Sequence, residues 1–156
     1  MKKIVLSLVI VLGVILLTGC GKIDFSKSSR LVCSKTEDKS NETTTTVLTL
    51  SYDRNEKIEN FMAESNIVYK TAMSQEALQI TEKTMKLIGK IPGINFESKV
   101  GDNSLYFNFS GNIKMLKTIM KQLDKTYDES KVTGDTKSEA LTELTQEGYS
   151  CQDIKK

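Results

Sequence analysis

Hydrophobic positions along the chain follow two different periods. In TTTTVLTLSY, residues 43–52, they alternate so that Leu48, Leu50 and Tyr52 share one face, which predicts a β-strand. The polar segment DRNEK, residues 53–57, forms a turn before a second apolar run, IENFMAESNIVY, and we expect the two arms to pair as an antiparallel hairpin. The shorter apolar piece RLVCSKT, which precedes both arms, predicts a short N-terminal strand.

A second hairpin is predicted in GINFESKVGDNSLYFNFSG, with its turn at residues 101–103. Leu105, Phe107 and Phe109 line one face of its second arm, and this aromatic face is the richest apolar feature of the domain. An apolar sheet face of this kind is usually covered by helices. The alternative is that it forms a ligand-binding site.

Three segments have the three-to-four-residue apolar spacing of helices. The first lies between Ser74, a candidate N-cap, and the stop signals Gly89 and Pro92; the second follows Asn112. The third begins with the capping box Thr136-Lys137-Ser138-Glu139 and ends at Gly148. Hairpins and helices in separate runs predict an α+β fold: an antiparallel sheet built from two hairpins plus a short N-terminal strand, with two or three helices packed on one face.

The N-terminus has the layout of a signal peptide. Lys2 and Lys3 precede an apolar run, Ile4 to Leu17, which at about 14 residues is shorter than the roughly 20 that a transmembrane helix needs. The next residues are Thr18, Gly19 and Cys20. An unmodified signal anchor is the alternative interpretation.

The segment Leu17-Thr18-Gly19-Cys20 resembles the lipobox of bacterial lipoproteins. The resemblance implies that the Cys20 thiol receives a diacylglyceryl group and that the chain is cut before it, and two acyl chains anchor a protein stably to a membrane. We therefore expect a signal peptide at 1–19, a lipidated and flexible tether at 20–29 and a single α+β domain at 30–156. The expected location is the extracytoplasmic face of the cell membrane.

Two cysteines remain beyond the lipobox, Cys33 and Cys151. An even number of thiols in an oxidising compartment predicts a disulfide, which would tie the two ends of the domain together. Two buried free thiols or a redox pair are the alternatives, and the absence of a C-x-x-C spacing argues against the redox pair.

Charge and composition exclude several classes of function. The chain of 156 residues has 22 Lys+Arg and 20 Asp+Glu; loss of Lys2 and Lys3 leaves 20 of each, which argues against a nucleic-acid partner. The chain contains no histidine and no tryptophan, and no phosphate-binding loop motif, so we predict no enzyme, no cofactor and no metal site.

One side of the second predicted helix carries a row of lysines. Its members are Lys114, Lys117, Lys121 and Lys125. Beside a membrane they are candidate contacts to an anionic surface, although lysines opposite an apolar stripe are usually just a solvated face.

The order of these elements behind a lipobox resembles the small YehR-type lipoproteins of bacteria, whose function is not established. The resemblance rests on the segments LTLSYDRNEKI, IPGINFES and GYSC. It implies helices packed against an antiparallel sheet and supplies no catalytic or binding residues.

These observations predict a non-catalytic, lipid-anchored lipoprotein that binds a protein or a cell-envelope component. The alternative is a lipoprotein that binds a small molecule on its aromatic sheet face.

Overall fold

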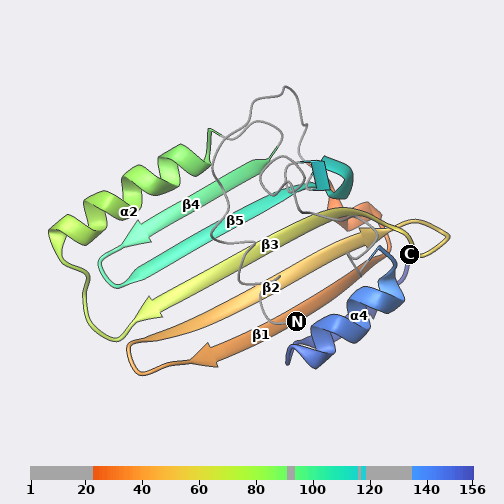
Figure 1. The fold of residues 1–156 in the computed structure, drawn as a ribbon, viewed down its shortest axis with the longest axis horizontal. Coiled ribbons are helices and arrows are strands. Elements are labelled where there is room, and N and C mark those ends of the chain that lie inside the picture. Colours follow the sequence, from red (N-terminus) through yellow and green to blue (C-terminus); the bar gives the residue numbers. More distant parts are fainter. Residues whose placement is uncertain (1–22, 91–93, 116, 119–134) are drawn as a thin grey trace.

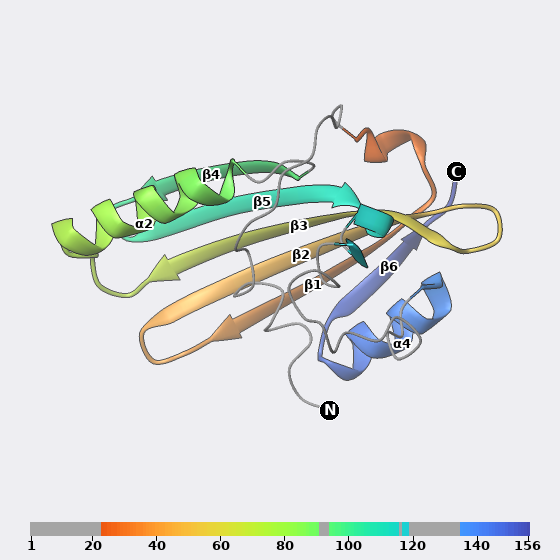
Figure 2. The same cartoon turned by 45° about the horizontal axis from the view of Figure 1, so that its top comes forward.

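The structure is a computed structural model, and it describes residues 23–90, 94–115, 117–118 and 135–156. Six strands form one sheet in the order β4-β5-β3-β2-β1-β6, and every neighbouring pair is antiparallel. Figure 1 shows β1 to β5 side by side, and Figure 2 shows β6 next to β1. The strands are β1 (Arg30–Asp38), β2 (Glu42–Tyr52), β3 (Ile58–Tyr69), β4 (Asn95–Gly101), β5 (Ser104–Asn112) and β6 (Ser150–Ile154). The predicted α+β class with an antiparallel sheet is confirmed.

Both predicted hairpins are present, and two features of the sheet go beyond them. β2 pairs with β3 around the turn at residues 53–57, and β4 pairs with β5. The N-terminal strand was predicted to be short, but β1 has nine residues and pairs with β2 along its whole length. β6 adds a sixth strand on the outer side of β1. β1 extends past its apolar half because backbone hydrogen bonds to β2 continue through polar residues.

Two helices, α2 (Gln75–Ile88) and α4 (Lys137–Gln146), lie on the same side of the sheet (Figure 2). Ser74 Oγ accepts a hydrogen bond from Ala77 N at 3.2 Å, so the predicted N-cap of α2 is confirmed. The predicted capping box of α4 is also present, and Gly148 follows this helix with φ at 88°. Residues 113–115 and 117–118 are helical, and the rest of the second predicted helix lies outside the described residues.

The helix-bearing face of the sheet contains two apolar clusters. In the first, Ala140 and Leu144 of α4 pack with Leu31 and Cys33 of β1. In the second, Phe61 and Phe109 meet edge to face with ring centroids 5.8 Å apart, and Phe107 is partly buried beside them. The aromatic face of the second hairpin therefore belongs to the core.

The opposite face of the sheet is polar. Its cross-strand rows include Thr49, Met62 and Ser110, and Tyr106 Oη donates a hydrogen bond to Glu64 Oε1 at 3.0 Å. At one corner of this face, Arg30 Nη1 donates to the carbonyl oxygen of Phe25 at 3.0 Å.

Part of the predicted tether is folded. The 3-10 helix η1 (Phe25–Lys27) is capped by Asp24, whose Oδ1 accepts from Ser26 N at 3.0 Å, and Phe25 is buried. Residues 25–27 thus form a helical turn where we expected a flexible tether, and the bond from Arg30 places the segment against the sheet. The segment 1–22, with the predicted signal peptide and Cys20, lies outside the described residues. No helix within the described part of the chain is long and apolar enough to cross a membrane.

Cys33 and Cys151 lie opposite each other on β1 and β6 and form a disulfide with an S–S distance of 2.05 Å. The bond joins the first strand of the sheet to the last one in the chain. Cys33 is completely buried in the first apolar cluster.

Substitution of Thr136 by alanine is expected to lower the free energy of unfolding by about 1 kcal/mol, because an N-cap hydroxyl satisfies an otherwise unpaired amide. Urea denaturation measures the change. Thr142→Ala is the matched control: Thr142 is exposed in the interior of α4 and bonds only the carbonyl of Ser138, so its removal is expected to be neutral. Equal midpoints for Thr136→Ala and Thr142→Ala would contradict the role of the cap.

Candidate functional site

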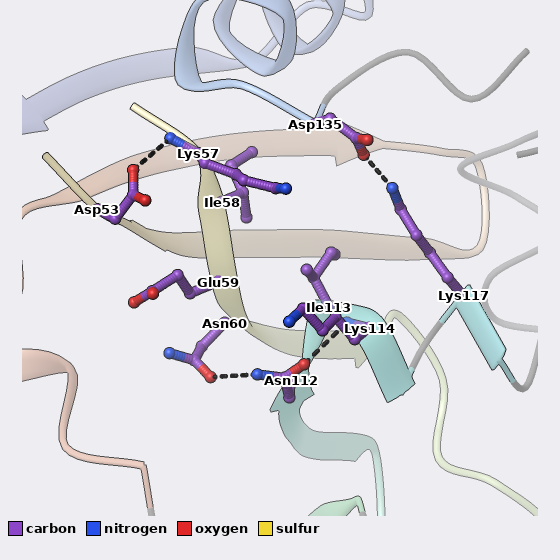
Figure 3. A pocket seen from close by; sticks show the side chains of 10 residues that line it. All are labelled: Asp53, Lys57, Ile58, Glu59, Asn60, Asn112, Ile113, Lys114, Lys117 and Asp135. Carbon is purple, nitrogen blue, oxygen red and sulfur yellow. Dashed lines mark hydrogen bonds and ion pairs between the residues drawn. The ribbon is translucent and has the colours of Figure 1, made fainter. Parts of the chain in front are cut away.

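A pocket of about 420 Å³ opens at the end of the sheet where β3 begins and β5 ends (Figure 3). It combines cationic, acidic and amide side chains with two isoleucines. The lining residues are Asp53, Lys57, Ile58, Glu59, Asn60, Asn112, Ile113, Lys114, Lys117 and Asp135.

The turn between β2 and β3 forms one wall of this pocket. Asp53 Oδ1 accepts hydrogen bonds from Asn55 N at 2.8 Å and from Lys57 N at 2.9 Å, which closes the turn around its own carboxylate. The turn is also bonded to the segment before α4, because Ile58 N donates to the carbonyl of Asp135 at 3.0 Å. These bonds bring Lys57 and Asp135 to the same pocket although they are far apart in the sequence.

A row of amides connects the pocket to the middle strands. Asn60 Nδ2 donates to Ser51 Oγ at 3.0 Å, and Asn112 Nδ2 donates to Asn60 Oδ1 at 3.4 Å. Asn112 Oδ1 accepts from Lys114 N at 2.8 Å, so Asn112 caps the helical turn that follows β5, as predicted. This cap brings Lys114 and Lys117 to the pocket lining.

The charges of the pocket are unevenly paired. Lys117 forms an ion pair with Asp135, and the Asp53 carboxylate is bonded to backbone amides. Among the described residues, no carboxylate lies within ion-pair distance of Lys57 or Lys114. The remaining acid of the lining, Glu59, is exposed, and its carboxylate points away from Lys117 (Figure 3). The lining as a whole holds three lysines and three carboxylates, so its formal net charge is zero. Lys57 and Lys114 are the lysines of the lining that no described carboxylate pairs, and they are the groups available to an anionic ligand.

Two of the four predicted surface lysines, Lys114 and Lys117, lie at this pocket. Lys121 and Lys125 lie outside the described residues. Sequence reasoning missed Lys57 and Asp135, because neither belongs to a periodic segment and nothing local links the two.

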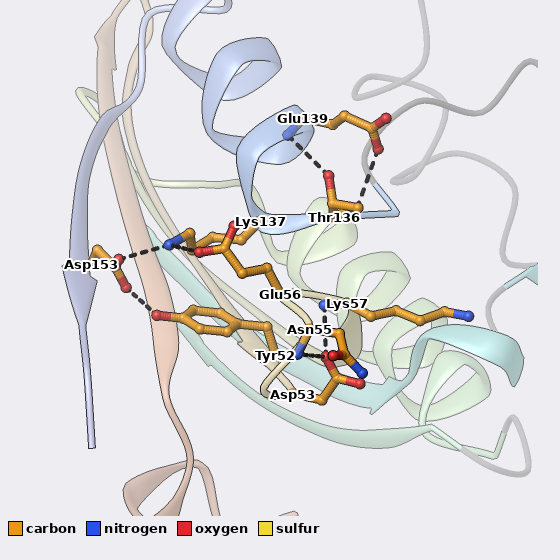
Figure 4. Close-up of polar contacts among 9 residues, drawn as sticks. All are labelled: Tyr52, Asp53, Asn55, Glu56, Lys57, Thr136, Lys137, Glu139 and Asp153. Carbon is orange, nitrogen blue, oxygen red and sulfur yellow. Dashed lines mark hydrogen bonds and ion pairs between the residues drawn. The ribbon is translucent and has the colours of Figure 1, made fainter.

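A second polar cluster, beside the pocket, joins the turn to α4 and β6 (Figure 4). Lys137 Nζ lies 2.5 Å from Glu56 Oε1 and 3.1 Å from Asp153 Oδ2, and Tyr52 Oη donates to Asp153 Oδ1. The Lys137 side chain is only 13% exposed, and its ammonium lies 5.2 Å from the centre of the Tyr52 ring. These charged groups bind one another, so the cluster holds three segments together.

The two carboxylate contacts, the one to Glu56 first, raise the pKa of Lys137. The hydrogen bond from Tyr52, with a smaller contribution from Lys137, lowers the pKa of Asp153 below its ordinary 3.8. A carboxyl group with a lowered pKa stabilises the fold above its unfolded pKa, and this stabilisation is lost as the pH falls through the folded pKa.

Substitution of Tyr52 by phenylalanine is expected to lower the free energy of unfolding by about 1 kcal/mol at neutral pH, a value reduced for the partial exposure of Asp153. The difference from the wild type should shrink as the pH falls below 3.8. Urea unfolding across this range measures it. Tyr69→Phe is the control, since the Tyr69 hydroxyl has no hydrogen-bond partner among the described residues. A loss independent of pH would contradict the coupling to Asp153.

A second hollow of about 310 Å³ lies between α2 and β4. It is lined by Glu82, Met85, Lys86, Gly89, Phe96, Ser98 and Val100. Within the described ranges, no group of three or more His, Cys, Asp or Glu side chains is arranged to hold a metal ion.

Comparison with known proteins identified no relative of this chain. No family model, no curated protein and no solved structure matches the chain.

Proposed function

We propose that this chain is a lipid-anchored, extracytoplasmic bacterial lipoprotein whose domain binds a protein or a cell-envelope component without catalysis. The observation that carries the proposal is the segment Leu17-Thr18-Gly19-Cys20 directly after an apolar run too short to span a membrane. The Cys33–Cys151 disulfide supports it, because such bonds persist mainly in oxidising compartments outside the cytoplasm.

Support for binding rather than catalysis comes from the available chemistry. The chain has no histidine, and Lys137 and Asp153 form an ion pair with one another. Within the described residues, the pocket holds two lysines outside ion pairs, an arrangement suited to recognition of an anionic group.

Crosslinking in intact cells tests this function. A tagged full-length chain is expected to form a discrete adduct with an envelope component, and an unrelated tagged domain placed after the same first 29 residues is expected not to form it. Adducts that are equally abundant and unselective for both chains would contradict the proposal.

A second candidate is a lipoprotein that binds a small molecule at the aromatic hairpin. The hollow beneath α2 favours it, because Phe96, Ser98 and Val100 of the hairpin line that space. The rest of the aromatic face argues against it: Leu105 and Phe109 are only 5% and 6% exposed. Native mass spectrometry of the protein from its host distinguishes the two, since a retained small molecule would favour the second candidate.

A further inference from the structure

The chain enters the sheet at the same end as the pocket lined by Lys57, Lys114 and Lys117. Arg30, the first residue of β1, pairs with Ser51, which pairs with Asn60, which pairs with Asn112 of the pocket. This row crosses three strand spacings, so the entry point and the far side of the pocket are about 14 Å apart.

The segment before the sheet is short and partly fixed. Phe25 is buried and bonded to Arg30, so a fixed point of the domain comes five positions after the proposed anchor at Cys20. Five Cα-to-Cα steps reach about 17 Å when fully extended. In contrast, β3 starts at the pocket and has 12 residues, so the opposite end of the sheet lies about 40 Å from the pocket.

The two ends of the sheet also differ in how their cations are paired. At the pocket end, Lys57 and Lys114 have no acidic partner among the described residues, and Arg54 is exposed at the tip of the adjoining turn. At the other end, Lys39 pairs with Glu42 at 3.5 Å and Lys70 pairs with Asp38 at 2.9 Å. Three exposed cations without an ion-pair partner among the described residues, Arg54, Lys57 and Lys114, therefore lie at the end of the sheet nearest the proposed anchor, where Glu59 is an exposed carboxylate outside an ion pair.

We infer that the pocket end of the sheet docks on anionic phospholipid headgroups of the membrane that holds the anchor, with Lys57 and Lys114 contacting their phosphates. This inference rests on the proposed lipidation of Cys20. Charge complementarity acts over about 8 Å at physiological salt, which a domain held within about 17 Å of the bilayer can reach. Each lysine near such a surface contributes about a fivefold bias toward the docked orientation. The opposite end of the sheet, with its polar loops, then points away from the membrane.

Depth-dependent quenching in reconstituted vesicles tests the orientation. An environment-sensitive dye is attached to the full lipidated chain at a cysteine introduced in one of two exposed turns. Asn55→Cys places the dye in the turn at the pocket end, and Asn41→Cys places it in the turn at the far end. Vesicles contain brominated phosphatidylcholine alone or with about 30% phosphatidylglycerol. We expect stronger quenching at position 55 than at position 41, and only in the anionic vesicles.

Charge reversal identifies the contacts. Lys57→Glu with Lys114→Glu should lower the ratio of docked to undocked chains at least 25-fold and bring the quenching at position 55 to its level in neutral vesicles. Lys83→Glu with Lys99→Glu makes the same change of net charge on α2 and β4 and should leave the quenching unchanged. Lys57→Gln with Lys114→Gln repeats the test without new acids.

The outcomes separate the two proposals. Chains that float with both kinds of vesicle but show equal quenching at positions 55 and 41, or lysine variants that behave as the wild type, overturn the docking alone. A chain that floats with neither kind of vesicle contradicts the anchor at Cys20 and the docking with it.

Discussion

Cells that express Cys20→Ser are expected to contain an unlipidated chain that still carries its signal peptide. The diacylglyceryl group is attached through a thioether, and serine has no sulfur with which to form it. Because two acyl chains contribute about 0.8 kcal/mol for each buried CH₂, their loss removes the lipid anchor, and the uncleaved apolar run at residues 4–17 remains as the hydrophobic attachment. Metabolic labelling with palmitate measures the loss of lipid, and the larger mass of the uncleaved chain measures the retained signal peptide.

The matched control for this variant is Cys33→Ala with Cys151→Ala, which removes the other two thiols of the chain and leaves the lipobox intact. This control should label as strongly as the wild type. Continued labelling of Cys20→Ser would contradict the anchor and the location that follows from it.

The same double variant is expected to lose about 4 kcal/mol of stability, the largest folding effect of any change considered. The disulfide spans 118 residues, and closing a loop of this length strongly restricts the unfolded chain. Loss of the buried Cys33 sulfur adds a small cavity beside Leu31. At about 2–4 °C per kcal/mol, the melting temperature should fall by roughly 10–15 °C.

Ser34→Ala with Ser150→Ala is the control for this change, since the two serines face each other one residue along the same strand pair. Both are exposed, so their removal should alter stability by less than about 0.5 kcal/mol. Mass spectrometry of the native protein should show it lighter than the dithiol by two hydrogen atoms. Two free thiols in the native wild-type protein would refute the disulfide.

Local sequence signals predicted the local structure well. Ser74 and Thr136 cap their helices through bonds to residues three positions later, so their partners lie within the same short segment. The turn at residues 53–57 is equally local, because Asp53 closes it by binding the backbone of Asn55 and Lys57.

The same local signals did not predict which strands pair when they are far apart in the sequence. Alternation along β5 and the apolar run of β3 predict two strands, but nothing in them specifies that Ala63 lies beside Phe109. β6 has five residues and a largely exposed pattern, so its membership of the sheet depends on hydrogen bonds to β1 rather than on hydrophobic periodicity. The pocket was missed for a related reason: Lys57 and Asp135 meet only after β3 and the start of α4 have come together.

The pairing of β1 with β6 has a consequence for secretion. A chain that crosses a membrane N-terminus first delivers β1 early, but the strand that covers its outer edge, Ser150–Ile154, emerges last. Until then, one row of backbone donors and acceptors on β1 lacks its partner, and Cys33 has no thiol with which to bond. An exported chain that is truncated before Ser150 would keep this edge, and bare edges of this kind pair with other chains. If the chain is exported as proposed, completion of translocation controls when the outer edge of β1 gains its partner strand.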